Sequence, residues 1–472
     1  MVRLTLAAAA AGAMGWGIRG QFGHETGAMI AGVLVSLVVV SMLRPHSPAA
    51  WSMRAVAFGT IGAGVGGAMT YGQTIGLTQD PALVGNWTAL QWGLLGLAIK
   101  GGLWIGIFGL LLGMGLGTVR YRARELFLVA LAAVALAMLG AWLLNEPYDP
   151  ARRALPRLYF SASWQWRPDA ADLSPRREVW GGLLLALTAL ATYTRWLRGD
   201  DLAWRLAGWG TLGGALGFPL GQCLQAYHAW NADVFARGIW LALDPYINWW
   251  NAMETTFGAV MGASLAYGAW HSRSRIAVAT MTPDRDGAHE PGALPVPLEW
   301  AGLLVHAALL LTAEFTDVPV LGRYADIPFV MGALPLALAA GGRSAPAVIA
   351  LPMTLLPIAG KTVRRLVYQQ HTVSPFVGWM CYAVVPVVLM GAAAWWLVRG
   401  TRARQREGPA VQVALLLAVW TYFALNFAFF AYPWPWTTWT NRTLHALVFA
   451  ACALLVTWFC QPEPAPPPVR RG

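Results

Sequence analysis

Long apolar runs alternate with short polar segments along most of this chain. Runs such as 30–43, 126–144 and 411–430 hold no charged residue, and their lengths approach the ~20 residues that a helix needs to cross a bilayer. The pattern predicts an all-α fold, a polytopic integral membrane bundle of about fourteen transmembrane helices. The predicted spans are 4–22, 26–43, 54–76, 88–118, 126–144, 179–197, 204–224, 248–270, 297–313, 327–342, 346–361, 375–398, 411–430 and 443–460.

The arginines between these runs predict the orientation of the bundle. Most of them lie in alternate loops, which hold Arg44 and Arg54, 120–124, 195–205, 273–275, 343 and 399–406. Because Arg-rich loops stay in the cytoplasm, we expect a multi-pass protein of a bacterial-type inner membrane with both termini inside. Lys361, Arg364 and Arg365 fall on the opposite side, so either one span is miscounted there or these cations have a role.

Composition supports the membrane class and narrows the partners. Hydrophobic residues make up 57% and charged residues 12% of the chain, whereas a soluble domain carries about 25% charge. A net charge of +11 would point to nucleic acid in a soluble protein. Arginines that flank membrane spans meet anionic lipid headgroups instead, so membrane lipid is an expected partner and nucleic acid is not.

Polar segments divide the chain into predicted regions. An N-terminal membrane half, 1–270, contains an external cap loop, 145–178, where both charges mix with aromatic residues. Residues 271–296 are predicted to form a cytoplasmic linker before a C-terminal membrane half, 297–460. The proline-rich end, 461–472, is predicted to be a disordered tail.

One glycine-rich motif occurs more than once. From Arg54 the chain reads R-x-x-x-F-G-T-I-G-x-x-V-G and then Gly-Gln at 72–73, and from Arg205 it reads R-x-x-x-W-G-T-L-G-x-x-L-G and then Gly-Gln at 221–222. A weaker third copy ends in the Gly-Gln of 20–21. We interpret these copies as parallel internal repeats of helical hairpins, in which the glycines allow close helix packing.

Two acidic residues lie near the ends of predicted spans with apolar and small neighbours. An ionisable group at the bilayer centre costs ~2.5–3.5 kcal/mol on insertion scales, so sequences keep such groups mainly for a site. Glu25 and Glu254, with His24 beside the first, are predicted to couple proton movement or to act as acid and base. Lys100, deep in the fourth span, is expected to pair with a buried carboxylate, for which Glu25 and Glu254 are the candidates.

Further polar and aromatic residues gather on the predicted outer side. Aromatic rings cover the apolar faces of a sugar, while amides and carboxylates match its hydroxyl groups, and the same groups suit an amino acid. We expect these residues to bind a small polar solute: Gln21, Gln73, Gln222, Gln225, His228, Asn231, Asn248, Asn251, Glu314, Asp317 and Trp249.

These features leave three classes of function open. The main expectation is a transporter of a sugar-like or amino-acid-like solute, with proton coupling as one form of it. The alternative is a membrane-embedded enzyme whose outward-facing carboxylate pair acts on a glycoside or lipid-linked sugar, and a sensor or assembly subunit is the third. The sequence has no HExxH motif and no phosphate-binding G-x-x-x-x-G-K-[ST] loop, so we expect neither a metal nor a cofactor.

Overall fold

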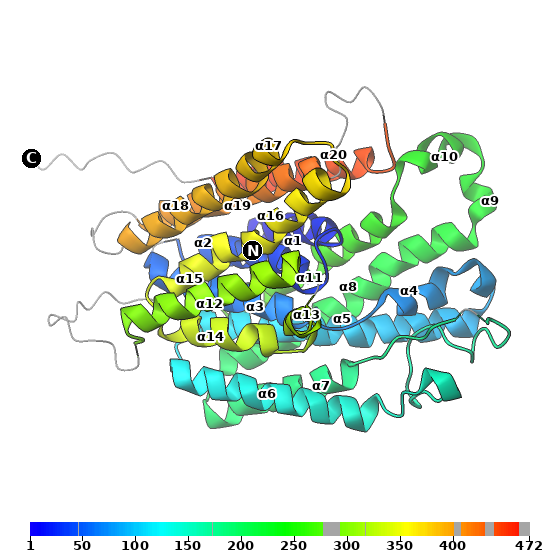
Figure 1. The fold of residues 1–472 in the computed structure, drawn as a ribbon, viewed down its shortest axis with the longest axis horizontal. Coiled ribbons are helices and arrows are strands. Elements are labelled where there is room, and N and C mark those ends of the chain that lie inside the picture. The colour runs from blue at the N-terminus through cyan, green and yellow to red at the C-terminus, as the bar shows by residue number, and fades with distance from the viewer. Residues whose placement is uncertain are drawn as a thin grey trace, which may run out of the picture.

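The computed structural model describes residues 1–45, 47–171, 173–276, 293–316, 318–400, 407–429 and 439–461. In these ranges the regular secondary structure is helical and contains no strand, as Figure 1 shows. The all-α prediction is therefore confirmed for the described residues. Asp317, most of the predicted linker and nearly all of the predicted tail lie outside them.

Several helices are long and apolar enough to cross a membrane. Within the described residues, seven meet this condition by length and composition: Glu25–Leu43, Trp87–Leu116, Ala123–Leu144, Val296–Phe315, Ala345–Gln369, Pro375–Arg399 and Pro409–Ala428. Each predicted span overlaps a helix. The count of about fourteen crossings nevertheless stays a prediction.

Six helices form a closed ring. Each of them packs against two neighbours, so that the series of contacts returns to the first helix. In order around the ring they are α1 (Val2–Arg19), α2 (Glu25–Leu43), α3 (Ala49–Val65), α5 (Trp87–Leu116), α8 (Asp201–Trp230) and α11 (Trp249–His271). All six come from the N-terminal part of the chain, so this part supplies the core on which the remaining helices pack.

Glycines allow the ring helices to approach closely. A Cβ atom on Gly12 of α1 would lie 2.2 Å from the carbonyl oxygen of Gly258 of α11, and one on Gly214 of α8 would lie 2.0 Å from that of Gly101 of α5. Real Cβ atoms do not come this close, so any side chain there would push the helices apart. Close backbone approach gives the van der Waals contact that holds helices together in lipid.

Polar caps start three of the ring helices. The side chains of Asn86, Asp200 and Asn248 accept hydrogen bonds of 3.0 Å from the backbone N–H groups three residues ahead. Such caps satisfy N–H groups that lack a partner within the helix. Asn248 therefore has a structural role at the start of α11. Its predicted solute-binding role stays a prediction.

The other helices cover the ring on its outside, as Figure 1 shows. Helices α6 and α7 pack against each other, α14 packs on α3 and α6, α16 and α19 pack on α2, and α20 packs on α1. Their bounds are α6 (Ala123–Leu144), α7 (Trp180–Thr192), α12 (Val296–Phe315), α13 (Pro319–Asp326), α14 (Val330–Gly341), α15 (Ala345–Val348), α16 (Thr354–Val363), α17 (Pro375–Trp379), α18 (Val385–Gly400), α19 (Glu407–Phe429) and α20 (Thr443–Phe459).

Short helices complete the chain path. They are α4 (Gly72–Gln79), α9 (Ala232–Phe235), α10 (Gly238–Leu243), η1 (Pro81–Leu83), η2 (Pro150–Arg152), η4 (Asp244–Tyr246) and η5 (Arg273–Arg275). Wider π-helical turns extend or join longer helices at η3 (Tyr193–Leu197), η6 (Ile349–Met353), η7 (Arg364–Gln369) and η8 (Met380–Val384). Helices α4, α9 and α10 lie at the same end of the molecule (Figure 1).

The three Gly-Gln pairs do not share one local structure. The pair at 20–21 follows the end of α1, the pair at 72–73 begins α4, and the pair at 221–222 lies inside α8, which continues to Trp230. The Gly-Gln pairs therefore do not occupy equivalent positions in their helices. The repeated hairpin itself stays a prediction.

Candidate functional site

Charged residues from distant parts of the chain meet inside the six-helix ring. Arg19 ends α1, Tyr71 immediately precedes α4, and Glu254 lies in the first two turns of α11. The side chains of Arg19 and Glu254 are 0% exposed, so this ion pair is closed to solvent. We call Arg19, Tyr71 and Glu254 the central cluster.

Hydrogen bonds in the central cluster converge on one carboxylate oxygen. Arg19 Nη2 donates to Glu254 Oε1 over 2.9 Å and also donates to the Tyr71 hydroxyl. Trp250 Nε1 donates to the same Oε1 over 3.1 Å. Arg19 Nη1 lies 3.1 Å from Nδ1 of His24. A buried ion pair offsets its desolvation cost only when such bonds surround it, and here they surround one side of the carboxylate.

Three buried polar atoms of this region have no hydrogen-bond partner among the described residues. They are Glu254 Oε2, Arg19 Nε and the indole nitrogen of Trp16. An unsatisfied buried polar group costs about 1–3 kcal/mol, and one in a native structure calls for an explanation such as a catalytic or ligand-binding role. Glu254 Oε2 is therefore a buried acceptor that no group of the described residues satisfies.

Aromatic rings surround the guanidinium of Arg19. Its Cζ atom lies 4.8 Å from the ring centroid of Trp16, 5.2 Å from that of Tyr71 and 5.4 Å from that of Trp104. A desolvated cation–π contact stabilises by about 2 kcal/mol. The rings thus hold the cation in place independently of the charge on Glu254.

A second group of charges lies beside the turn that follows α1. Glu314 Oε1 lies 3.2 Å from Arg364 Nη2, and Glu314 Oε2 lies 3.8 Å from Lys361 Nζ. Lys361 also donates to the carbonyl oxygen of Phe22 over 2.5 Å and to Thr26 Oγ1 over 3.1 Å. We call Lys361, Arg364 and Glu314 the lateral cluster. Two of the three cations that break the predicted orientation pattern, Lys361 and Arg364, thus have a carboxylate partner.

The turn between α1 and α2 links the two clusters. Gln21 and Glu25 are half-buried in or beside this turn, and His24 is exposed. Glu25 interacts electrostatically with both Arg19 and Lys361. The structure therefore brings the predicted proton-handling residues His24, Glu25 and Glu254 into one region around Arg19.

Glycines make this turn possible. A Cβ atom on Gly20 would lie 2.5 Å from Glu254 Oε2, and one on Gly23 would lie 2.9 Å from Lys361 Nζ. Gly23 also has a φ of 89°, a left-handed conformation that other residues rarely adopt. Both charged clusters therefore depend on the absence of side chains in the turn.

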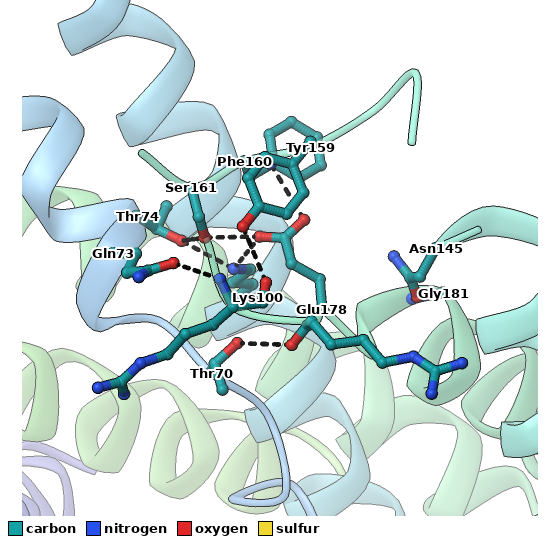
Figure 2. Close-up of polar contacts among 12 residues, drawn as sticks. Thr70, Gln73, Thr74, Lys100, Asn145, Tyr159, Phe160, Ser161, Glu178 and Gly181 are labelled. Atoms are coloured by element: carbon teal, nitrogen blue, oxygen red, sulfur yellow. Dashed lines mark hydrogen bonds and ion pairs between the residues drawn. The ribbon is translucent and has the colours of Figure 1, made fainter. Parts of the chain in front are cut away.

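The structure corrects the predicted partner of Lys100. Its Nζ atom donates to Glu178 Oε1 over 2.6 Å and to Thr74 Oγ1 over 2.7 Å, so neither Glu25 nor Glu254 is its counter-ion. Ser161 Oγ donates to the same Glu178 oxygen over 2.8 Å. Figure 2 shows Lys100 and Glu178 pointing toward each other within this group. Glu178 belongs to the predicted cap, so the pair anchors the cap to α5.

Two glutamines of the Gly-Gln pairs, Gln73 and Gln222, also hold elements together. Gln73 donates to the carbonyl oxygen of Ser174 and accepts from the backbone N–H of Arg176, both over 2.7 Å. Gln222 Nε2 donates to Thr78 Oγ1 over 2.7 Å. These bonds tie the cap and α4 to their neighbours. The buried Oε1 atoms of Gln222 and Gln225 have no hydrogen-bond partner among the described residues, so they retain acceptor capacity.

His228 and Trp249 form a separate group near α9 and α10. Their rings stack with centroids 4.6 Å apart, and both side chains contact Asp244, His228 Nε2 over 2.9 Å and Trp249 Nε1 over 2.7 Å. Asn231 donates to the carbonyl oxygen of Tyr227 over 2.8 Å. The polar contacts of this group are with Asp244 and Tyr227, whereas Glu254 is bound by Arg19, Tyr71 and Trp250.

Asn251 connects α1, α11 and the segment before α20. Its Nδ2 donates to the carbonyl oxygen of Gly17 over 3.0 Å, and its Oδ1 accepts from Arg442 Nη1 over 2.7 Å. Asn251 is only 2% exposed. Both ends of the amide are therefore occupied by protein groups, which indicates a structural role one turn from Glu254.

Sequence reasoning missed two residues that form fully buried ion pairs. Arg19 lies within the predicted span 4–22, where an arginine in an apolar segment is itself a signal for a functional site. Glu178 lies at the boundary between the cap and a span, where a carboxylate carries no such signal. The pairing of Lys100 with Glu178 was therefore not readable from local pattern.

The described residues contain no group of three or more His, Cys, Asp and Glu side chains placed to hold a metal ion. No protein-family model, no curated protein and no solved structure matches this chain. The functional argument therefore rests on the geometry of the clusters.

Proposed function

We propose that this chain is a multi-pass inner-membrane transporter of a small polar solute, sugar-like or amino-acid-like, whose transport is coupled to a proton at Glu254. The observation that carries the proposal is the Arg19–Glu254 pair, fully buried in a helical ring and with Glu254 Oε2 unpartnered. Burying such charges in apolar surroundings costs free energy, which indicates a role such as transport.

The geometry supports a loosening of the Arg19–Glu254 ion pair when Glu254 binds a proton. When Glu254 binds a proton at Oε2, its attraction for Arg19 falls, while the rings around Arg19 still hold the guanidinium. Loosening of this pair weakens the contact between α1 and α11, which is otherwise sealed by glycines. A proton would therefore bias the ring between two arrangements, as a coupled transporter requires.

The experiment is uptake by purified protein in proteoliposomes. Labelled amino acids and sugars are offered with and without an inward proton gradient. We expect gradient-dependent uptake by the wild type and a loss of about tenfold or more in Glu254→Gln, because the amide cannot bind and release the coupled proton. Glu146→Gln, which affects a cap carboxylate 26% exposed and paired with Arg177, is the matched control and should retain uptake.

Two results would contradict this function. One is the absence of uptake for every solute in the panel by a folded wild-type protein. The other is gradient-dependent uptake in Glu254→Gln equal to that of the wild type, with folding of both proteins verified by size-exclusion chromatography.

The enzyme alternative has less support from the geometry. Hydrolysis of a glycoside by a carboxylate pair requires both groups to flank an accessible bond at about 5–10 Å from each other. Glu254 is instead buried behind Gly20 and paired with Arg19. The proton-handling interpretation of Glu254 fits this burial better than an acid–base role toward a large substrate.

A further inference from the structure

A second candidate site lies at the opposite end of α2 from the central cluster. A cavity of about 870 Å³ opens between the start of α6, the end of α14 and the segments around Arg54 and Arg198. Helix α2 has 19 residues and so separates its two ends by about 28 Å. This cavity is therefore independent of the charges around Arg19.

The lining of this cavity, which we call the basic cavity, is strongly positive. Six of its lining residues are arginines and a single one is a carboxylate, Glu125. Glu125 Oε1 is already 2.9 Å from Arg198 Nε and accepts a hydrogen bond from Tyr193. The arginines are Arg54, Arg120, Arg122, Arg124, Arg198 and Arg343.

Buried cations deepen the positive charge behind the cavity wall. Arg54 is 6% exposed and Arg44 is 5% exposed. Arg44 donates to the carbonyl oxygen of Leu116, but its Nε and Nη1 atoms have no hydrogen-bond partner among the described residues. Burial, with the nearby charges of Arg54 and Arg120, lowers the pKa of Arg44 to about 10. Arg44 and Arg54 therefore repel each other where both are buried, and the exposed Arg120 adds a third positive charge nearby.

Asp200, a buried carboxylate beside Tyr121, is already engaged. Asp200 Oδ2 accepts from the Tyr121 hydroxyl over 2.9 Å, and its Oδ1 accepts from the N–H of Ala203 over 3.0 Å. Asp200 also interacts electrostatically with Arg54. Even with Glu299, a buried carboxylate whose Oε1 accepts from the backbone N–H groups of Ser344 and Ala345, the carboxylates near the cavity among the described residues are fewer than its six arginines.

The basic cavity continues into a second one. That neighbour, of about 500 Å³, shares Arg54, Arg120 and Arg343 with it. Arg120 is held over the Trp51 ring at 3.5 Å. The six arginines reach the basic cavity from four chain segments, and Arg54 is buried there, Arg198 is half-buried and the other four are exposed.

We propose that the basic cavity binds a phosphate-bearing anion. Guanidinium groups bind phosphate oxygens in bidentate fashion, and several of them around one cavity match a group with two or more negative charges. The volume falls in the range of about 300–1,000 Å³ that is typical of ligand sites, which exceeds a bare phosphate and leaves room for an attached group. Leu128, 54% exposed on α6, also lies on the cavity lining, so the phosphate belongs either to a soluble compound or to a lipid headgroup.

The test uses two probes on the purified full-length protein. In the first arm, inorganic pyrophosphate is titrated calorimetrically into protein in nanodiscs of zwitterionic phosphatidylcholine. In the second arm, thermal unfolding is compared between nanodiscs of phosphatidylcholine alone and nanodiscs that also contain phosphatidylglycerol. Both arms use the wild type, Arg54→Gln, Arg343→Gln and the control Arg152→Gln, whose side chain is 85% exposed next to Asp149.

We expect at least one probe to act on the wild type and the control. In the first arm, each cavity variant should lose about tenfold in affinity for pyrophosphate, the equivalent of one strong polar contact. In the second arm, each cavity variant should lose the rise in Tm that depends on phosphatidylglycerol. Pyrophosphate binding identifies a soluble ligand, whereas a response to phosphatidylglycerol alone identifies a lipid headgroup. The proposal is overturned if neither probe acts on the wild type, or if both variants respond as the wild type does. If Arg54→Gln does not fold, the exposed Arg343→Gln decides the result.

Discussion

Gly20 stands where the end of α1 meets the carboxylate of Glu254, and the missing side chain is what lets them meet. The same holds for Gly23 beside Lys361. Charged groups in an apolar environment are stabilised mainly by short, well-oriented contacts. Two glycines therefore control whether Arg19 and Lys361 reach their partners.

We expect Gly20→Ala to destabilise the protein by about 1–3 kcal/mol, because a Cβ placed 2.5 Å from Glu254 Oε2 forces the carboxylate or α1 to move. Denaturant unfolding in detergent measures the change. Gly76→Ala is the matched control, since a Cβ there meets nothing within 4 Å, and within α4 it should be neutral or slightly stabilising. Equal stability of Gly20→Ala and the wild type would show that the pair tolerates a side chain in the turn.

The Lys100–Glu178 pair permits a sharper test of a buried charge. We expect Lys100→Met to cost about 3–5 kcal/mol, because it leaves the Glu178 carboxylate buried without its cation. The double variant Lys100→Met, Glu178→Leu should regain most of this loss, because it removes both charges. Unfolding free energies of the two single variants and the double variant form the cycle. A double variant as unstable as the sum of the singles would contradict the assigned pairing.

At the scale of elements, ion pairs connect helices that hydrophobic packing alone would leave free to slide. Asp201, at the start of α8, contacts Arg195 of η3 over 2.9 Å, Arg205 of α8 over 2.7 Å and Arg275 of η5 over 2.6 Å. One carboxylate thus joins three elements at the end where α7, α8 and α11 meet. These partners are partly exposed, so each contact alone contributes little.

The stability of this junction should depend on pH in the acid range. The hydrogen bond from Arg205, with the charges of Arg195 and Arg275, lowers the pKa of Asp201 below its usual value. A lowered pKa in the folded state means that the stabilisation is complete above about pH 4, the value of a free Asp, and is lost as pH falls through the folded value. We expect Asp201→Asn to lose up to about 1 kcal/mol at pH 7 and to show a flatter decline of stability below pH 4.

Unfolding midpoints of the wild type and Asp201→Asn, recorded from neutral to acid pH, check this expectation. Added salt should shrink the difference at neutral pH, because screening weakens partly exposed pairs. A difference that grows as the pH falls would have the wrong sign and would contradict the role of Asp201.

For the whole molecule, polar chemistry is divided between two ends of the ring. The central and lateral clusters lie where α2 begins, and the basic cavity lies beyond the end of α2. A hydrocarbon core of about 30 Å would fit between them. The proposed transport site and the proposed anion site would thus face opposite sides of a membrane.

Cysteine labelling tests this arrangement. Ser161, a natural choice in the cap, is only 1% exposed, so an introduced cysteine should replace an exposed residue instead. We expect Arg152→Cys in the cap and Arg124→Cys at the start of α6 to react with a membrane-impermeant maleimide from opposite sides, because the 22 residues of α6 separate them by about 33 Å. The background is the protein with Cys223 and Cys381, both exposed, changed to Ser. Labelling of both positions from one side would exclude a crossing by α6.

The local pattern was sufficient for some features and insufficient for others. Apolar runs predicted the helices well, since hydrophobic length is a property of neighbouring residues. The local pattern also identified Glu254 as a candidate site residue, because a carboxylate with apolar neighbours is unusual. The local pattern assigned Lys100 to the wrong partner. It did not indicate that Asn248 caps a helix or that Gln73 bonds to the cap loop, and the solute-binding role of both stays a prediction.

The sequence by itself determined the all-helical class and the position of scarce charges, because helix formation and hydrophobic length are decided within a few turns of chain. Only the tertiary structure decided which charges pair. Arg19 and Glu254 are 235 residues apart and Lys100 and Glu178 are 78 apart, and the closure of the ring brings each pair together. Leaving a charge unpaired away from water costs free energy. Those pairings, which no local pattern records, therefore distinguish this molecule from a generic helical bundle.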